Sequence, residues 1–202
     1  MRPEYLDDIF ESLEWLRIDW DEGPRSAHDF LQNWSQHRRM AHYEQALQAL
    51  REAGVLFPCK RSRQQLAAWH GEYPPERRGD FTDSWDEPDT AWRMNTPPGF
   101  LLPAFVVKRR DGLPAYQLAS LTDDRLFGIT HVVRGEDLAP STEAQRLLAR
   151  ALGWSFFEKI RVYHHPLITD EAGQKLSKSA GAYSLRQMRL EGRMPDTLRP
   201  RY

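Results

Sequence analysis

The order of the elements between residues 128 and 163 constrains the fold of this chain more than any other feature. Residues 129–134, Ile-Thr-His-Val-Val-Arg, are typical of a buried strand. Ser141 can N-cap a helix with an apolar face, and Gly153 can end that helix. Residues 160–163 then have the pattern of another strand. A strand, a helix and a strand in this order predict a βαβ unit, so we expect an α/β fold with a parallel sheet and flanking helices.

The first quarter of the chain predicts two helices. Pro3 opens the first, whose apolar residues have the spacing of one buried face: Leu6, Ile9, Leu13 and Leu16. The second is expected from about Ser35 to Ala53, with Gly54 as its stop. Its inward residues should be Tyr43, Leu47 and Leu50.

The middle of the chain differs from the rest in composition and periodicity. Residues 58–104 are rich in Pro, Arg, Trp and acids with little periodicity, which indicates an irregular inserted subdomain. Residues 105–110 and 115–119, separated by Asp111-Gly112, predict a β-hairpin. The chain is therefore expected to divide into residues 1–57, 58–104 and 105–202.

Composition excludes several classes of protein. The single cysteine, Cys59, excludes an internal disulfide and a cysteine-rich zinc site, and it fits a reducing, cytoplasmic setting. The formal net charge of −1 does not indicate nucleic-acid binding by the whole molecule, although the short C-terminal tail is basic. No apolar run approaches the roughly 20 residues of a membrane span, and the acidic N-terminus lacks a signal-peptide pattern. We expect no membrane partner.

A cationic loop stands out near the C-terminus. Residues 173–181 place Lys175 and Lys178 three positions apart, with Ser177 and Ser179 interleaved and a glycine at each end. A basic loop rich in hydroxyl donors can close over a polyphosphate and stabilise the charge that develops on it. A solvated basic loop without a ligand has the same composition.

Two side chains could hold an anionic ligand. Arg134 ends the predicted strand at the edge where open α/β sheets place ligands, and its guanidinium can hold a carboxylate by two parallel hydrogen bonds. The alternative for Arg134 is a structural ion pair with Glu136 or Asp137. Tyr116 offers a hydroxyl on the predicted hairpin, unless it is a core aromatic.

Three further residues admit both structural and functional interpretations. Asp123 and Asp124 could cap a short helix or orient a ligand, and capping is the favoured interpretation. His164 could contact a nucleotide, but a lone histidine in this position is more often structural.

Taken together, these motifs resemble a known family. Residues 128–138, Gly-Ile-Thr-His-Val-Val-Arg-Gly-Glu-Asp-Leu, followed by Lys-Leu-Ser-Lys-Ser at 175–179, resemble the glutamyl-tRNA synthetase family of class I aminoacyl-tRNA synthetases. Residues 3–24 and 115–124 are similar to further segments of that family. The short tail after residue 181 is most similar to its truncated branch, the glutamyl-Q tRNA(Asp) synthetases.

The resemblance implies a fold, a reaction and partners. The fold would be an incomplete Rossmann-type nucleotide-binding domain interrupted by an inserted acceptor-stem-type subdomain. The reaction would be ATP-dependent activation of glutamate, with Mg²⁺, and its transfer to tRNA. Tyr116 and Arg134 would hold glutamate, and Lys175 and Lys178 would be catalytic. ATP would be bound by the residues of the Lys-Ser signature and by one histidine: Lys175, Leu176, Ser177, Lys178, Ser179 and His164.

The chain also departs from the family pattern. It begins after the position of the His-Ile-Gly-His-type signature, so we expect impaired activity in this chain alone and an unpaired sheet edge with exposed apolar surface. The alternatives are a non-catalytic paralogue that binds tRNA or a partner, or one half of a split synthetase whose other chain supplies the missing part. Cys59 and Tyr73 match a family zinc site, but Arg61 and Arg77 replace its other cysteines, so no zinc is expected.

Overall fold

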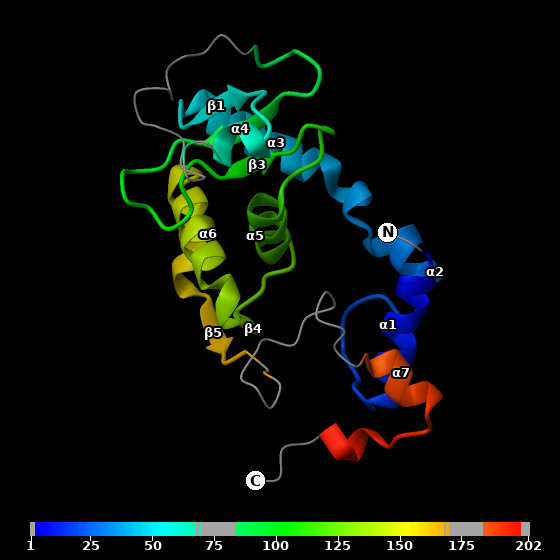
Figure 1. The fold of residues 1–202 in the computed structure, drawn as a ribbon. Coiled ribbons are helices and arrows are strands. Elements are labelled where there is room, and N and C mark those ends of the chain that lie inside the picture. The colour runs from blue at the N-terminus through cyan, green and yellow to red at the C-terminus, as the bar shows by residue number, and fades with distance from the viewer. Residues whose placement is uncertain (1–2, 68, 70–83, 168, 170–183, 199–202) are drawn as a thin grey trace. The chain divides into compact units, whose positions relative to one another are not determined.

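The structure is a computed structural model that describes residues 3–67, 69, 84–167, 169 and 184–198 (Figure 1). The chain forms two compact units, one of residues 1–39 with 167–202 and the other of residues 40–166. The predicted division at residues 57 and 104 remains a prediction.

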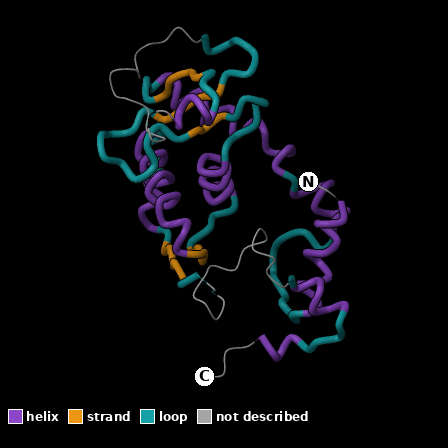
Figure 2. The backbone as a smooth tube through the Cα atoms, in the orientation of Figure 1, coloured by secondary structure: helices purple, strands orange, loops and turns teal. Residues whose placement is uncertain are grey.

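The larger unit, residues 40–166, contains two small sheets and the helices packed on them. Its elements are α3 (Met40–Glu52), β1 (Leu56–Cys59), α4 (Arg63–Ala67), β2 (Ala91–Met94), β3 (Val106–Lys108), α5 (Tyr116–Leu126), β4 (His131–Gly135), α6 (Ala139–Ala151) and β5 (Arg161–His165). Short 3-10 turns lie at Glu136–Leu138 and Ser155–Lys159. Strands β1, β2 and β3 form an antiparallel sheet in that order, and β4 and β5 form a parallel pair. Figure 2 shows α5 and α6 of this unit between the two groups of strands.

The predicted βαβ unit is confirmed. Strand β4 pairs in parallel with β5 in a register that aligns Arg134 with His164, and α6 connects the two strands. The expectation of a buried strand was wrong, because Val133 is 71% exposed and its neighbour in register, Tyr163, is 57% exposed. One face of the pair packs against the core through Val132 and the other face carries the exposed side chains. The predicted exposed apolar surface is therefore present.

Helix α6 begins earlier than its sequence pattern predicts. Leu138 occupies the N-cap position, and Pro140 lies in the first turn, where its missing N–H leaves no bond unmade. Ser141 is thus a buried residue inside the helix and not its cap. The predicted end is correct, because Gly153 follows the helix with a φ of +68°.

The second arm of the predicted hairpin is a helix. Strand β3 is followed by a turn closed by a bridge between Lys108 and Pro114, and α5 then begins at Tyr116. The reason is helical burial: Leu118, Leu121 and Thr122 are spaced to face the core together, which a strand of alternating faces could not achieve. Asp123 and Asp124 lie in the last turn of α5, so the capping interpretation was wrong.

A single core cluster joins most of the larger unit. The buried face predicted for α3 is confirmed at Tyr43, Leu47 and Leu50, and Gly54 ends the helix with a φ of +68°. Residues from the antiparallel sheet, from α3, α5 and α6 and from the segment before β5 share this core: Ala46, Leu47, Leu50, Leu56, Trp92, Met94, Phe105, Val107, Leu118, Leu121, Ala144, Leu148, Ala149, Phe157 and Ile160. Val132 and Val162 of the parallel pair are partly buried and pack against it. The helices therefore hold the two sheets together.

The smaller unit joins the two ends of the chain. Its helices are α1 (Pro3–Trp15), α2 (Ala27–Asp29) and α7 (Leu185–Leu190), with a π-helical turn at Phe30–Trp34 and 3-10 turns at Gln36–Arg39 and Pro195–Leu198. Arg189 of α7 forms ion pairs with Asp8 and with Glu11 of α1, the latter at 3.0 Å. The predicted face of α1 is confirmed at Leu6, which is buried, but Ile9 is 48% exposed. None of the described helices is long and apolar enough to cross a membrane.

Candidate functional site

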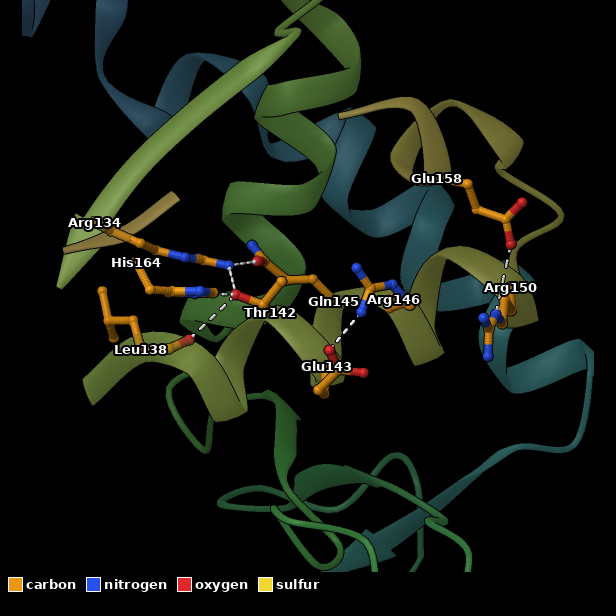
Figure 3. Close-up of polar contacts among 9 residues, drawn as sticks. All are labelled: Arg134, Leu138, Thr142, Glu143, Gln145, Arg146, Arg150, Glu158 and His164. Atoms are coloured by element: carbon orange, nitrogen blue, oxygen red, sulfur yellow. Dashed lines mark hydrogen bonds and ion pairs between the residues drawn. The ribbon is translucent and has the colours of Figure 1, made fainter. Parts of the chain in front are cut away.

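The candidate site is organised around Arg134, near the carboxyl end of β4. Its side chain extends toward α6, and Figure 3 shows it beside His164 of the neighbouring strand. Nη2 of Arg134 donates to Oε1 of Gln145 at 2.7 Å and also to Oγ1 of Thr142. The guanidinium is thus held by two side chains that project from one helix.

Tyr116 lies within reach of the same guanidinium. Nη1 of Arg134 donates to the Tyr116 hydroxyl across 3.4 Å, and the Tyr116 side chain is 49% exposed. The structure therefore brings together the two residues that the sequence singled out for an anionic ligand. In the part of the chain that the structure describes, Arg134 contacts Tyr116, Thr142 and Gln145 and forms no ion pair with Glu136 or Asp137, and Tyr116 is too exposed to be a core aromatic.

His164 joins this network through α6. Its Nε2 lies 2.8 Å from Oγ1 of Thr142, which also donates to the carbonyl of Leu138 across 3.4 Å. This hydrogen bond supports the structural interpretation of His164. A contact between His164 and a nucleotide remains a prediction.

Sequence reasoning missed three residues of the network: Ser120, Thr142 and Gln145. Thr142 and Gln145 are spaced by three positions on α6 and so lie on the same helix face, and both are almost fully buried. Ser120 links them to α5, because it accepts from Nε2 of Gln145 at 2.6 Å and donates to the Tyr116 carbonyl at 2.7 Å. Polar residues on the buried face of an amphipathic helix were the available signal, since such residues need hydrogen-bond partners.

The charges around Arg134 are unusual. Its hydrogen-bond partners in the described part of the chain are all neutral side chains. Asp124 interacts electrostatically with Arg134. Burial raises the pKa of Asp124 to about 6, while the charge of Arg134 lowers that pKa and the charge of Asp123 raises it. Asp123 itself accepts a hydrogen bond from the Tyr43 hydroxyl at 2.6 Å. The positive charge of the Arg134 guanidinium is therefore not neutralised by a carboxylate hydrogen-bonded to it within the described residues.

Asp124→Asn should stabilise the protein in a pH-dependent way. Because the pKa of Asp124 is raised in the folded state, that state retains a proton that the unfolded chain has lost, and stability falls as the pH rises from about 4 to about 6. We expect the variant to gain about 1 kcal/mol at neutral pH, after allowing for solvent screening. Urea unfolding at several pH values measures this, with Glu44→Gln on the exposed face of α3 as the control. An equal gain below pH 4 would contradict the assignment to Asp124.

A second polar feature lies on the antiparallel sheet. A hollow of about 510 Å³ is lined by four arginines, Arg61, Arg93, Arg109 and Arg110, together with Ser62, Asp89, Ala91, Val106 and Asp111. Arg93 donates to the carbonyl of Ala104 at 2.7 Å, and Arg109 forms an ion pair with Asp111 at 2.5 Å. The excess of cations makes this hollow suitable for a phosphate-bearing ligand.

Comparisons with known proteins place the chain in a family. The family model described as the catalytic domain of class I tRNA synthetases (E and Q) matches residues 90–199. This chain belongs to that family. It is 36% identical to a glutamyl-Q tRNA(Asp) synthetase of Symbiobacterium thermophilum, over 98% of this chain and 69% of the relative. It is 31% identical to a glutamate–tRNA ligase of Coprothermobacter proteolyticus, over 98% of this chain and 46% of the relative.

The solved structures agree on the fold. The crystal structure of a glutamate–tRNA synthetase from Elizabethkingia anophelis matches with a TM-score of 0.66 at 24% identity, over 86% of this chain and 42% of that one. The predicted fold class is therefore confirmed as a partial Rossmann-like domain of the class I synthetases. The chain spans about two thirds of the length of the glutamyl-Q relatives and about half that of the longer ligase.

Several family positions lie outside the described residues. They include the whole Lys-Ser signature, namely Lys175, Leu176, Ser177, Lys178 and Ser179, so the structure does not place it. Tyr73 and Arg77 of the altered zinc motif are also outside. Cys59 is buried in β1, and the Arg61 guanidinium lies 5.3 Å from the centre of the Trp69 ring. The described residues contain no group of three or more His, Cys, Asp or Glu arranged to hold a metal.

Proposed function

We propose that this chain forms part of a synthetase site that activates glutamate with ATP for transfer to tRNA. The observation that carries the proposal is the pair of Arg134 and Tyr116, which presents a guanidinium with neutral hydrogen-bond partners beside the hydroxyl of a half-exposed tyrosine at the carboxyl end of a parallel strand. Ligands of open α/β sheets bind at that edge. An acidic amino acid suits it, because its carboxylate can accept from both side chains.

The proposed reaction forms a mixed anhydride. An oxygen of the glutamate α-carboxylate attacks the α-phosphorus of ATP, the bond to the bridging oxygen breaks, and pyrophosphate leaves. Lys175 and Lys178, with the rest of the signature and Mg²⁺, would stabilise the charge on the phosphates. Glutamate would then pass to a tRNA acceptor, with release of AMP. Arg134 and Tyr116 contribute by positioning the amino acid.

A binding module is the second candidate function. The arginine-lined hollow on the antiparallel sheet favours contact with RNA phosphates, because guanidinium groups bind phosphate oxygens well. The exposed face of β4 and β5, with Val133 and Tyr163, favours a partner that covers apolar surface. A separate chain that completes the synthetase would provide such a cover.

Glutamate-dependent exchange between ATP and pyrophosphate tests the proposed function. We expect little exchange from the chain alone, and exchange when the part of the Symbiobacterium relative outside the match is added as a separate polypeptide. Lys178→Ala should lower that exchange by about 100-fold or more, and Lys159→Ala should leave it unchanged.

The same preparations distinguish the second candidate. If exchange is absent in both mixtures, the synthetase proposal fails. Binding of tRNA that weakens steeply between about 50 mM and about 200 mM salt would then support the RNA-binding module.

A further inference from the structure

We propose that Gln145 is the positioning residue that locks Arg134 and Tyr116 into one geometry for an acidic ligand. This inference rests on the proposed function of those two residues and adds a role for a third. Gln145 is 1% exposed and lies on α6, where it touches both β4 and α5 through hydrogen bonds. It cannot contact a ligand in solvent directly, so any effect on binding must pass through Arg134 and Tyr116.

The hydrogen bonds form a closed ring. Arg134 donates from Nη1 to the Tyr116 hydroxyl and from Nη2 to Oε1 of Gln145. Gln145 donates from Nε2 to Oγ of Ser120, and Ser120 donates to the backbone carbonyl of Tyr116. The ring therefore begins and ends at Tyr116, and it links three different elements: α5, β4 and α6.

The chemistry of the side chains determines which group donates and which accepts at each hydrogen bond of the ring. The amide oxygen of Gln145 must face the guanidinium, because an amide NH₂ would oppose the N–H donors of Arg134. The amide nitrogen then faces Ser120, whose single hydroxyl hydrogen is left for the Tyr116 carbonyl. Flipping the Gln145 amide would set its NH₂ against the N–H donors of Arg134, so the hydrogen bonds of the ring cannot be reversed in this way.

The ring also decides which donors remain for a ligand. Both hydrogens of Nη2 are used, one by Gln145 and one by Thr142. The sequence suggested that a carboxylate could accept two parallel hydrogen bonds from the end of the guanidinium. That binding mode is blocked, because Nη2 has no hydrogen left to donate. A carboxylate must instead bridge Nη1 and the Tyr116 hydroxyl, which the ring holds 3.4 Å apart.

Neutral partners preserve the charge that attracts the ligand. A glutamate at position 145 could also accept from Arg134, but it would neutralise the guanidinium. Glutamine supplies the same acceptor without the charge and adds the donor that Ser120 needs. Geometry and charge at Arg134 can therefore be separated by comparing two substitutions at this single position.

The experiment compares Gln145→Met and Gln145→Glu in the full chain. Nitrogen-15 NMR of the Arg134 side chain reports hydrogen exchange and rotation at Nη2, and titration with L-glutamate reports binding. For Gln145→Met we expect faster Nη2 exchange and an affinity about ten-fold lower, because one charge-assisted hydrogen bond is lost. For Gln145→Glu we expect the slow Nη2 exchange to remain while the affinity still falls.

Two further variants guard against a general loss of structure. Ser120→Ala breaks the ring at a half-buried position without emptying the core, and it should loosen Arg134 as Gln145→Met does. Thr122→Val is the matched control, because among the described residues the Thr122 hydroxyl bonds only to the Leu118 carbonyl, at 2.8 Å within α5. This control should change neither readout.

The outcomes separate the inference from the function on which it rests. Unchanged Arg134 signals in both Gln145→Met and Ser120→Ala would overturn the positioning role, whatever the affinity. If the unaltered chain does not bind L-glutamate, the proposed glutamate site fails, while the NMR comparison still decides whether Gln145 positions Arg134. Equal affinities in the unaltered chain and in Gln145→Met would also overturn the inference.

Discussion

Arg134→Lys should reduce L-glutamate binding by about 100-fold or more, despite keeping the positive charge. A lysine ammonium has its three donors on one nitrogen and cannot reach Gln145, Thr142 and Tyr116 at once, as the planar guanidinium does. The substitution also leaves the buried amide oxygen of Gln145 without its donor. Isothermal titration of the full chain with L-glutamate measures the loss.

The control for this prediction lies on the neighbouring helix. Arg146 pairs with Glu143 on α6 and takes no part in the ring, so Arg146→Lys should leave the affinity unchanged. Circular dichroism of both variants checks that they fold. If Arg134→Lys binds L-glutamate within about twofold of the unaltered chain, charge alone suffices and the guanidinium geometry has no role.

Leu148→Ala should have the largest effect on stability. Leu148 is fully buried at the centre of the core that α6 shares with both sheets. Removing its side chain loses apolar burial and leaves a cavity, and we expect a loss of about 3 kcal/mol in the free energy of unfolding. Urea unfolding followed by circular dichroism measures the change.

Its matched control is the preceding leucine. Leu147 lies on the same helix but only packs against the edge of the core, so Leu147→Ala should lose about 1 kcal/mol. Equal losses for the two substitutions would show that the core does not centre on Leu148. Because the chain has two compact units, the transition of the larger unit should be the one that shifts.

Local sequence patterns predicted the elements whose periodicity matches their burial. The βαβ order, the stops at Gly54 and Gly153 and the inward face of α3 all follow from residues close together in the chain. The error at residues 115–119 has a physical cause. An apolar pattern of five residues fits a strand or a helix, and only packing against the core selects the helix that begins at Tyr116.

In the candidate site, too, some features follow from the sequence and others depend on tertiary packing. The sequence by itself determined that Arg134 and Tyr116 are chemically suited to an anion and that a parallel strand ends beside Arg134. Only the tertiary structure decided that these two residues meet, and that Gln145 and Ser120 close a ring around them. The reason is that side-chain hydrogen bonds depend on distances between α5, β4 and α6, and packing of the shared core sets those distances.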